Sequence, residues 1–295
     1  MKDKMYDIAF VGNYTKDTIV SKAGKRNVDG GAVNYGAHLA VRLGLKVAVI
    51  TRLAKEDARM VENLEKAGVD VYPYYTPEST TFILEYPTDN VDHRIIHYKA
   101  SAGSITPDQV KEINAKVFSI GPSIRGEVPL EVIKELKKKP AKVSLDVQGY
   151  IRVIEDNILV NREWPEIGEY LSLVDYLKTD AVEAESLTGE QDRRKAAAIL
   201  AGYGPKEVVL THRDGIQVYD GENYYDQKFH YQKLVGRSGR GDSVIATYIG
   251  TRLKYPPAEA LIWAAAATSL KLEAEGPFKR TKEEVEALIN EKYRT

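Results

Sequence analysis

The run GRSGRGDS at residues 236–243 combines glycines, arginines and one carboxylate in an order that suits phosphate chemistry. Its glycines lead directly into an apolar helical pattern, so backbone N–H groups near Gly239, Arg240 and Gly241 should converge at a helix start. Such a position attracts phosphate or a developing negative charge. Asp242 would repel phosphate, but it could take a proton from a hydroxyl that attacks phosphorus. In the alternative interpretation Asp242 only caps the helix.

Motifs of several other reactions do not occur in the sequence. No lysine follows the glycines as a P-loop requires, and no G-x-G-x-x-G follows the first strand, which disfavours a dinucleotide site. The five histidines show no H-E-x-x-H spacing, and no G-x-S-x-G elbow is present. The absence of cysteine excludes disulfides, thiolate nucleophiles and cysteine-ligated zinc.

A second glycine run, DGGAVNYGAHLAVRLG at 29–44, also opens an alanine-rich helical pattern. Paired glycines allow a ligand to approach the backbone closely, and a helix start offers free N–H groups. Asn34 falls in the first turn, where its amide could face a cleft. Because Gly-Gly before a helix is common, this run becomes informative only together with other polar positions.

Strand-like and helix-like segments alternate along most of the chain, which predicts an α/β fold with a mostly parallel sheet covered by helices on both faces. The expected strands are 7–13, 46–52, 116–122, 142–149, 174–180 and 207–212, and the expected helices include 32–43, 56–67, 128–139 and 192–203. Segments 14–30 and 69–99 have alternating polar and apolar residues without helices between them, so we expect them to form hairpins of a small inserted β subdomain.

Polar residues follow the predicted strands of the large sheet, at the edge where open α/β sheets bind ligands. The set consists of carboxylates, amides and a hydroxyl: Asn13, Asp17, Asp146, Gln148, Asp180, Glu183 and Thr211. Each one alone is equally explained as a loop residue or a helix N-cap. Together with the glycine run they indicate a ligand site.

The bulk composition excludes other classes of protein. Lys plus Arg number 42 and Asp plus Glu 43, so the net charge of −1 leaves no basic surplus for nucleic acid or an acidic membrane. No apolar run approaches the roughly 20 residues of a membrane span, and the first residues lack the apolar core of a signal peptide. We expect a soluble, cytoplasmic protein with small-molecule partners, and with neither nucleic acid nor membrane among them.

The ordered set of motifs resembles the ribokinase-like (PfkB) carbohydrate kinases along nearly the whole chain. GNYTKD at 12–17 is similar to the first-strand motif of that family, and the resemblance implies that Asp17 holds substrate hydroxyls. The helix that starts at 32 resembles the Gly-Gly-x-x-x-Asn motif, which implies that Gly31 and Asn34 contact the substrate. GRSGRGD resembles the C-terminal signature, which implies an anion hole at Gly239, Arg240 and Gly241 and a catalytic base at Asp242.

The segment LKTDAVEAESLTG at 177–189 resembles the Asn-x-x-Glu motif that arranges Mg²⁺ and phosphate, with Asp180 in place of the usual asparagine. The resemblance implies that Glu183 holds Mg²⁺ indirectly. Two further departures lie in the signature, where Gly236 replaces an aspartate and Arg240 replaces a small residue. That aspartate belongs to a loop that often helps bind a monovalent cation, so the resemblance does not carry potassium activation to this chain.

SLDVQGYIRV at 144–153, together with AAAATSLKLEAEGP at 264–277, looks most like the myo-inositol kinase branch of the family. On that interpretation Asp146, Gln148 and Arg152 lie near the acceptor or the path of the phosphate. Arg152 is equally explained as a salt-bridged surface residue.

The resemblance therefore implies a ribokinase-like three-layer sandwich formed by 1–295 as one kinase domain, with a β lid formed by about 14–30 and 69–100. It also implies ATP as the donor and Mg²⁺ as the cofactor. Because an inserted β lid often leaves exposed strand edges that pair with another subunit, we also expect that a homodimer can form through the lid. The nucleotide would contact Asp180, Glu183, Thr211, Gly239 and Gly241, with the adenine near the helix that contains 264–269.

Two alternatives stay open at this point. The acceptor could be a nucleoside, a ketohexose or a sugar acid, since aromatic residues of the predicted lid could stack on a base. A protein of the same fold could also sense ligands without catalysis, although such a sensor would have no need for the base Asp242.

Overall fold

The computed structural model describes residues 4–22, 24–88 and 94–294, and a nine-stranded sheet runs through its centre in the order β15-β14-β13-β12-β9-β8-β1-β4-β5. Neighbouring strands from β13 to β5 pair in parallel, whereas β14 and β15 run antiparallel at one edge. The bounds are β1 Met5–Val11, β4 Val47–Ala54, β5 Asp70–Thr76, β8 Asn114–Ile120, β9 Lys142–Asp146, β12 Tyr176–Asp180, β13 Glu207–Thr211, β14 Gly215–Tyr219 and β15 Tyr224–Lys228.

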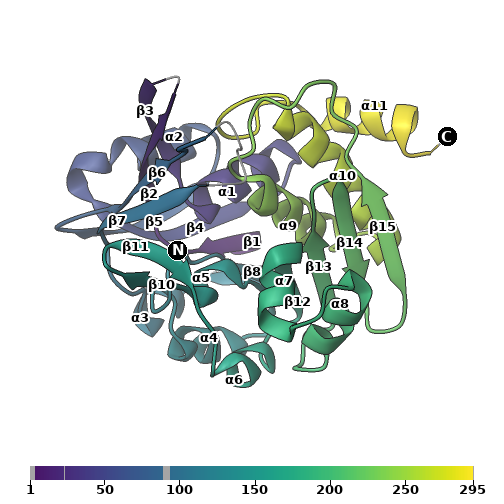
Figure 1. Ribbon diagram of the computed structural model, residues 1–295, viewed down its shortest axis with the longest axis horizontal. Helices are drawn as coiled ribbons and strands as arrows, with labels where there is room; N and C mark the ends of the chain where they lie inside the picture. The colour runs from purple at the N-terminus through teal and green to yellow at the C-terminus, as the bar shows by residue number, and fades with distance from the viewer. Residues whose placement is uncertain (1–3, 23, 89–93, 295) are drawn as a thin grey trace.

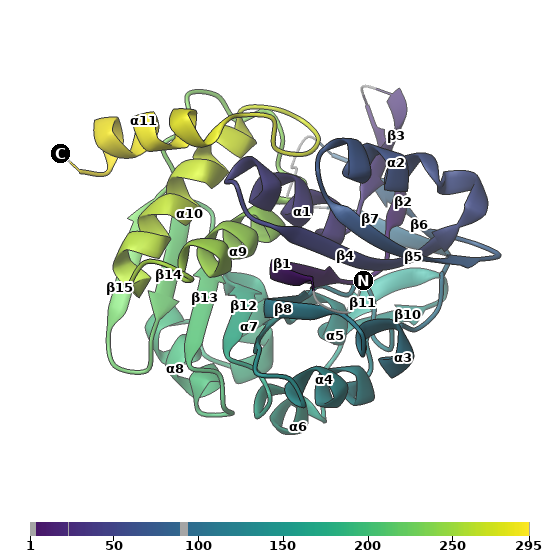
Figure 2. The same ribbon diagram turned by 180° about the vertical axis from the view of Figure 1, so that it is seen from behind.

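Helices cover both faces of this sheet, as Figures 1 and 2 show from opposite sides. One apolar core joins the sheet to α3 Pro107–Val110, α4 Leu130–Lys137, α6 Ile167–Leu171, α7 Ala181–Thr188 and α8 Arg193–Ala201. The other joins it to α1 Ala32–Arg42, α2 Arg59–Lys66, α9 Arg240–Thr251 and α10 Pro257–Leu272, and α11 Lys282–Lys292 packs on α1 and α10. The predicted three-layer α/β architecture is confirmed.

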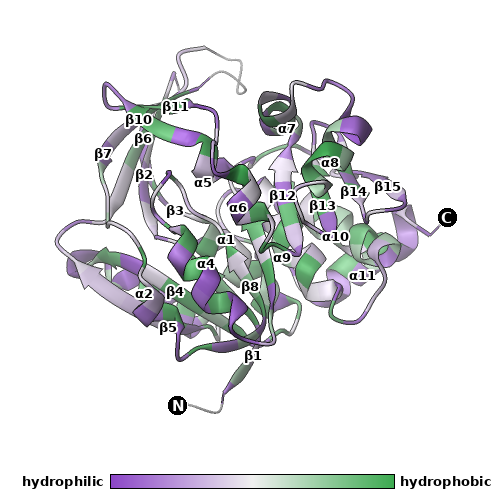
Figure 3. Cartoon of the chain, turned by 90° about the horizontal axis from the view of Figure 1, so that it is seen from below, coloured by the Kyte–Doolittle hydropathy of each residue, from purple (hydrophilic) through white to green (hydrophobic). Residues whose placement is uncertain are grey.

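The central strands are apolar along their length because both of their faces are covered, which is the expected pattern for a parallel sheet. The last four residues of β1 and all of β13 are buried. The helices instead carry both apolar and polar residues (Figure 3), as a helix does when one face packs on a sheet and the other meets solvent.

A second, six-stranded sheet forms the lid, in the order β10-β11-β7-β6-β2-β3. Its strands are β2 Thr15–Ser21, β3 Gly24–Gly30, β6 Thr80–Glu85, β7 Ile95–Ala100, β10 Arg152–Glu155 and β11 Ile158–Asn161. An apolar cluster of lid side chains packs around Ile124 of the large domain. The lid therefore joins the large domain on the side of the β1 and β8 carboxyl ends (Figure 1).

The lid differs from the predicted segments in two places. Residues 70–76 belong to β5, which pairs in parallel with β4 as an edge strand of the large sheet. An edge strand is covered less than a central one, and β5 is half-buried or exposed along its whole length, so it lacks the continuous apolar run of a central strand and resembles a hairpin strand. Residues 152–161 add the hairpin β10–β11, whose turn residues Asp156 and Asn157 have positive φ values of 49° and 61°, as two-residue hairpin turns require.

No helix within the described parts of the chain is long and apolar enough to cross a membrane. Two short elements complete the fold, a 3₁₀ turn η1 at Lys55–Asp57 and the helix α5 at Gln148–Ile151. The predicted strand 142–149 therefore ends at Asp146, and the chain continues as a helical turn at the edge of the sheet.

A buried ion pair fixes α9 to the large sheet. The Arg252 guanidinium at the end of α9 donates to both carboxylate oxygens of Glu207 on β13, with its shortest contact at 2.6 Å, and the Tyr248 hydroxyl donates to the same carboxylate at 2.5 Å. Glu207 is only 6% exposed. The helix that begins with the glycine run is thus anchored at its far end.

Replacing Arg252 by methionine should destabilise the protein by about 3 kcal/mol, because the Glu207 carboxylate would remain buried without its partner. Urea unfolding of the variant measures this loss. Arg194→Met is the matched control, since Arg194 pairs with Asp226 at the exposed surface, and its expected effect is below about 1 kcal/mol. Equal effects of the two variants would contradict the anchoring role.

Candidate active site

The glycine run forms a tight turn into α9. Arg240 is the first residue of the helix, and Gly239 at the N-cap adopts the left-handed conformation with φ 77°, which residues with side chains rarely adopt. The Ser243 N–H donates to the Gly239 carbonyl at 2.9 Å, and the Arg240 N–H donates to the Arg237 carbonyl at 3.2 Å. Of the amides expected to hold an anion, the one of Arg240 is therefore already engaged within the turn.

Close packing explains why two of these positions are glycines. A Cβ on Gly239 would overlap the ring of Tyr35, which comes from α1. A Cβ on Gly241 would lie 2.8 Å from Cε and 3.0 Å from Nζ of Lys178, which comes from β12. The turn is thus enclosed between an aromatic ring and a lysine side chain.

Asp242 lies in the first turn of α9 and faces Asp146 at the end of β9. The two carboxylates line one cavity of about 10 Å³, together with Ser119 and Ser144 of the neighbouring strands, so its size matches a single water molecule. Burial raises the pKa of Asp242 to about 6, Asp146 adds to the rise, and the cations Lys178, Arg152 and Lys271 oppose it. Such a carboxyl is a base poised near neutral pH.

Lys178 is a buried cation between two of the expected site residues. It is 4% exposed, and its Nζ lies 3.1 Å from Oδ2 of Asp146 and 3.6 Å from Oε2 of Glu183. Burial disfavours its ammonium form, but the facing carboxylates outweigh this effect and raise the pKa of Lys178 above its usual range. Its proximity to Gly241 places a permanent positive charge next to the proposed anion hole.

Asp180 and Glu183 cap α7 reciprocally. The Asp180 carboxylate accepts from the Glu183 N–H, and the Glu183 carboxylate accepts from the Asp180 N–H, both at 2.8 Å. Burial raises the pKa of Glu183 to about 7, while Lys178 lowers it. The Lys178 ammonium lies against the carboxylates of both Asp146 and Glu183, so these two carboxylates do not fit as direct ligands of Mg²⁺. No group of three metal-binding side chains occurs among the residues that the structure describes.

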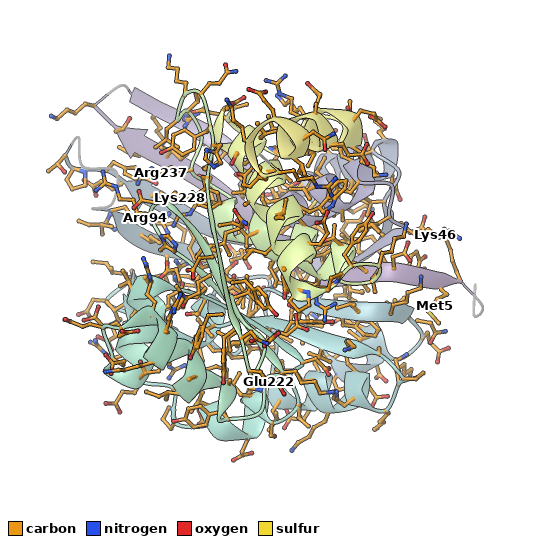
Figure 4. All side chains as sticks on the ribbon, turned by 90° about the vertical axis from the view of Figure 1, so that its right-hand side faces the viewer. Met5, Lys46, Arg94, Glu222, Lys228 and Arg237 are labelled. Carbon is orange, nitrogen blue, oxygen red and sulfur yellow. The ribbon has the colours of Figure 1, made fainter. Side chains whose placement is uncertain are left out.

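Arg152 stands where α5 passes into the lid strand β10. Its guanidinium forms no ion pair with a carboxylate of the described residues, and burial together with Arg94 lowers its pKa to about 10. Arg94, labelled in Figure 4, comes from the lid next to β7. The Gln148 N–H donates to Oδ1 of Asp146 at 3.0 Å and so orients that carboxylate. Two neighbouring guanidinium groups form an environment for an anion. The alternative explanation of Arg152 as a salt-bridged residue finds no ion pair in the described parts of the chain.

The three residues expected to hold the acceptor lie at the junction of the lid and α1. Burial raises the pKa of Asp17 to about 6, and its Oδ1 is buried without a hydrogen-bond partner. Gly31 has φ 91° before α1, and a Cβ there would lie 2.7 Å from the carbonyl oxygen of Asn13. The Asn34 amide donates to the Asp29 carbonyl at 2.9 Å. Of the three, Asp17 has an acceptor atom still to be satisfied.

Thr211 does not join this cluster. It is 1% exposed, and its hydroxyl donates to the Thr179 carbonyl at 3.4 Å. The helix residues expected near an adenine are also buried, since Ala264 and Ser269 are both 0% exposed, and the Ser269 hydroxyl accepts from the His230 N–H at 2.8 Å. These residues offer no exposed surface on which an adenine ring could bind.

The sequence profile of the pfkB family of carbohydrate kinases matches residues 4–282. The chain belongs to this family. It is therefore a phosphotransferase that acts on a hydroxyl group.

Two solved kinase structures and one characterised kinase are similar to this chain. A solved pyrophosphate-dependent kinase of the ribokinase family, in complex with a pyrophosphate analogue and myo-inositol, matches with a TM-score of 0.88 and 34% identity over 95% of this chain and 99% of that chain. A myo-inositol-1 kinase converted into a myo-inositol-3 kinase, also pyrophosphate-dependent, matches with a TM-score of 0.88 and 33% identity over 97% and 99%. Cytidine kinase of Thermococcus kodakarensis is 27% identical over 264 residues, 86% of this chain and 91% of its own. The predicted resemblance to this family and to a myo-inositol kinase is confirmed.

Lys178 is the site residue that the sequence analysis missed. The signal was present, because one lysine interrupts the apolar strand pattern VDYLKTD, and lysine is almost never fully buried unless it is paired. A lysine two residues before the predicted end of a central strand therefore required a carboxylate partner at the same sheet edge.

Asp242→Asn should lower kcat by roughly 10²- to 10⁴-fold, the usual contribution of a general base, without lowering the melting temperature. The wild-type rate should fall as the pH drops through about 6, because the base is active only when ionised. Steady-state kinetics over pH and thermal unfolding test both points, with the exposed Asp108→Asn as control. A near-normal rate for Asp242→Asn would remove Asp242 as the base.

Lys178→Met should reduce kcat/KM by roughly 100-fold or more, because the preorganised charge at the anion hole is lost. Lys178 also helps to keep Asp242 ionised, so the acid limb of the rate profile should move to higher pH. Lys142→Met is the control, since Lys142 lies at the exposed start of β9. An unchanged pH profile with a reduced rate would indicate a structural role only.

Proposed function

We propose that this kinase transfers a phosphoryl group from pyrophosphate to a hydroxyl of myo-inositol. The observation that carries the reaction is the buried Asp242, whose pKa of about 6 suits a base and which lies close to Lys178 and Arg152. Asp242 accepts the proton of the attacking hydroxyl, whose oxygen bonds to phosphorus. The bond from phosphorus to the bridging oxygen breaks, and phosphate leaves with that electron pair.

The acceptor is proposed to lie between the lid and the glycine turn. The unsatisfied Oδ1 of Asp17 is the proposed acceptor of a substrate hydroxyl, with Gly31 and Asn34 beside it. Holding the hydroxyl next to Asp242 converts an encounter in solution into a positioned attack, which together with electrostatic stabilisation accounts for the rate enhancement in phosphoryl transfer.

The donor is proposed to lie over Gly239 and Gly241, with its charge met by Lys178, Arg152 and Arg240. Asp146 and Gln148 hold Lys178 and the α5 turn in place. Asp180 and Glu183 are proposed to act on the donor only through Lys178 or through an Mg²⁺ ion that arrives bound to the phosphates. No step in this scheme depends on a protein-bound metal.

Pyrophosphate is favoured over ATP for a physical reason. The contacts predicted for an adenine, Thr211 and the segment 264–269, are buried by the protein itself, whereas the charged part of the site needs only phosphate oxygens. The similar kinase bound to a pyrophosphate analogue agrees with this proposal. ATP, the donor expected from the family resemblance, is the second candidate.

Among acceptors, the specific alternative is a nucleoside, because cytidine kinase is one of the similar proteins. The identities of 34% and 33% to myo-inositol kinases, against 27% for cytidine kinase, favour the cyclitol. The cytoplasmic location and the homodimer through the lid stay predictions. For the latter, β3 forms an edge of the lid sheet and its residues 24–27 are exposed, as pairing with a second copy requires.

The test is a matrix of donors and acceptors followed by ³¹P NMR. Pyrophosphate and ATP are each combined with myo-inositol, cytidine, ribose, fructose and gluconate, with Asp242→Asn as the inactive control. We expect inositol phosphate from pyrophosphate and myo-inositol at a higher kcat/KM than from any other pair. A preference for cytidine would contradict myo-inositol as the acceptor, and a preference for ATP would contradict pyrophosphate as the donor. Tight binding without transfer from any pair would indicate that the protein is a ligand sensor.

A further inference from the structure

Lys271 is a second buried lysine near the glycine turn, and it differs from Lys178 in having no carboxylate partner. It lies near the end of α10 and is 2% exposed. Among the described residues its ammonium forms no ion pair. Its Nζ donates instead to the carbonyl oxygens of Gly236 at 3.2 Å and Ala274 at 3.4 Å, and it lies 5.7 Å from the centre of the Tyr35 ring.

These partners belong to the segment that carries the anion-binding turn. The N–H groups of Val235 and Gly236 donate to the Leu272 carbonyl at 2.8 Å and 3.0 Å, so the segment is attached to the last turn of α10. A Cβ on Gly236 would overlap the Ala274 carbonyl. The two backbone segments are thus in direct contact, and the Lys271 ammonium joins their carbonyl oxygens.

Tyr35 extends this contact to the turn itself. Its ring lies against Gly239 and is also within cation–π distance of Lys271. Lys271 also acts on the base directly, because its charge lowers the pKa of Asp242. One ammonium group therefore contacts the start of the glycine run, supports its middle through Tyr35 and favours the ionised form of Asp242.

Packing alone does not explain an ammonium at this place. Burying an unpaired cation costs free energy, and burial accordingly lowers the pKa of Lys271 to about 8. A methionine would fill a similar volume without this cost. Carbonyl oxygens around a compact positive charge are the arrangement in which proteins hold a free monovalent cation, and here the cation is covalently attached to the chain.

We infer that Lys271 is a built-in monovalent cation that holds residues 236–241 in the shape that binds the transferred phosphoryl group. The enzyme should then need no added potassium, sodium or ammonium ion. This inference rests on the proposed roles of the glycine turn and Asp242. Lys271 is a positioning residue, since it acts on the reacting groups through the backbone, Tyr35 and the electric field.

The experiment compares wild type with Lys271→Ala in choline, sodium, potassium and ammonium chloride at equal ionic strength. The wild-type kcat should be the same in all four salts. Lys271→Ala should lose roughly 100-fold in kcat in choline chloride, because misplaced groups at a reacting centre cost about this much, with a smaller change in the acceptor KM. Potassium or ammonium ions should restore at least a tenth of the lost activity by occupying the vacated position.

Lys282→Ala is the matched control, because Lys282 also lies over an aromatic ring, that of Trp263, but at the exposed surface. It should behave as wild type in every salt. Lys271→Met provides a second variant that fills the position, and it should lose activity without rescue by any cation. A folded Lys271→Ala that no cation rescues, or a wild type that requires potassium, would overturn the inference.

Thermal unfolding detects a cation bound at the Lys271 position without any measurement of enzyme activity. Ions that bind the folded Lys271→Ala should raise its melting temperature in potassium or ammonium relative to choline chloride, whereas wild type and Lys282→Ala should show no such difference. If no donor and acceptor pair gives a product, the proposed function fails while this measurement still tests the cation site. Equal salt effects on all variants would contradict the site itself.

Discussion

The ion pair between Lys178 and Asp146 is the interaction on which the active site depends. The two residues lie opposite each other in the register of β12 and β9, so the pair exists only when these parallel strands align as observed. A slip by one residue would turn every side chain of a strand to the other face of the sheet. The same ammonium reaches Glu183 at the start of α7 and lies against Gly241 at the start of α9, so one charge fixes the relative position of three elements.

The sequence predicts the large sheet because its signals are local. Central strands such as β8 and β13 are buried on both faces, and an apolar run bounded by polar residues is sufficient to recognise them. Edge strands lack this signal, which is why Pro73 and the surrounding tyrosines of β5 resembled a hairpin. The strands β10 and β11 have only four residues each, which is too short for an alternation of polar and apolar residues to be recognised in the sequence.

The sequence was sufficient to predict which residues belong to the candidate site, but not which of them interact with one another. Asp242 and Asp146 were found because they follow a glycine run and a strand, and Arg152 because the run 144–153 resembles one branch of the family. In the structure both Asp146 and Arg152 act on the pKa of Asp242. The partners of Lys178 depend on strand register, which no local pattern encodes. Thr211 shows a second limit of such patterns, since the hydroxyl of a polar residue at a strand end can donate to a neighbouring backbone carbonyl, as it does here to Thr179.

The charges of the cleft explain how one site can hold a polyanion and a base together. Asp17, Asp242 and Glu183 all have raised pKa values, because burial disfavours their charged forms. The cations Arg152 and Lys271 have no carboxylate partner within the described residues and are left to oppose negative charge that enters. A donor with several negative charges raises the pKa of Asp242 further and makes it a stronger base. The same cations keep Asp242 ionised until the acceptor hydroxyl arrives, so basicity increases only when the donor is in place.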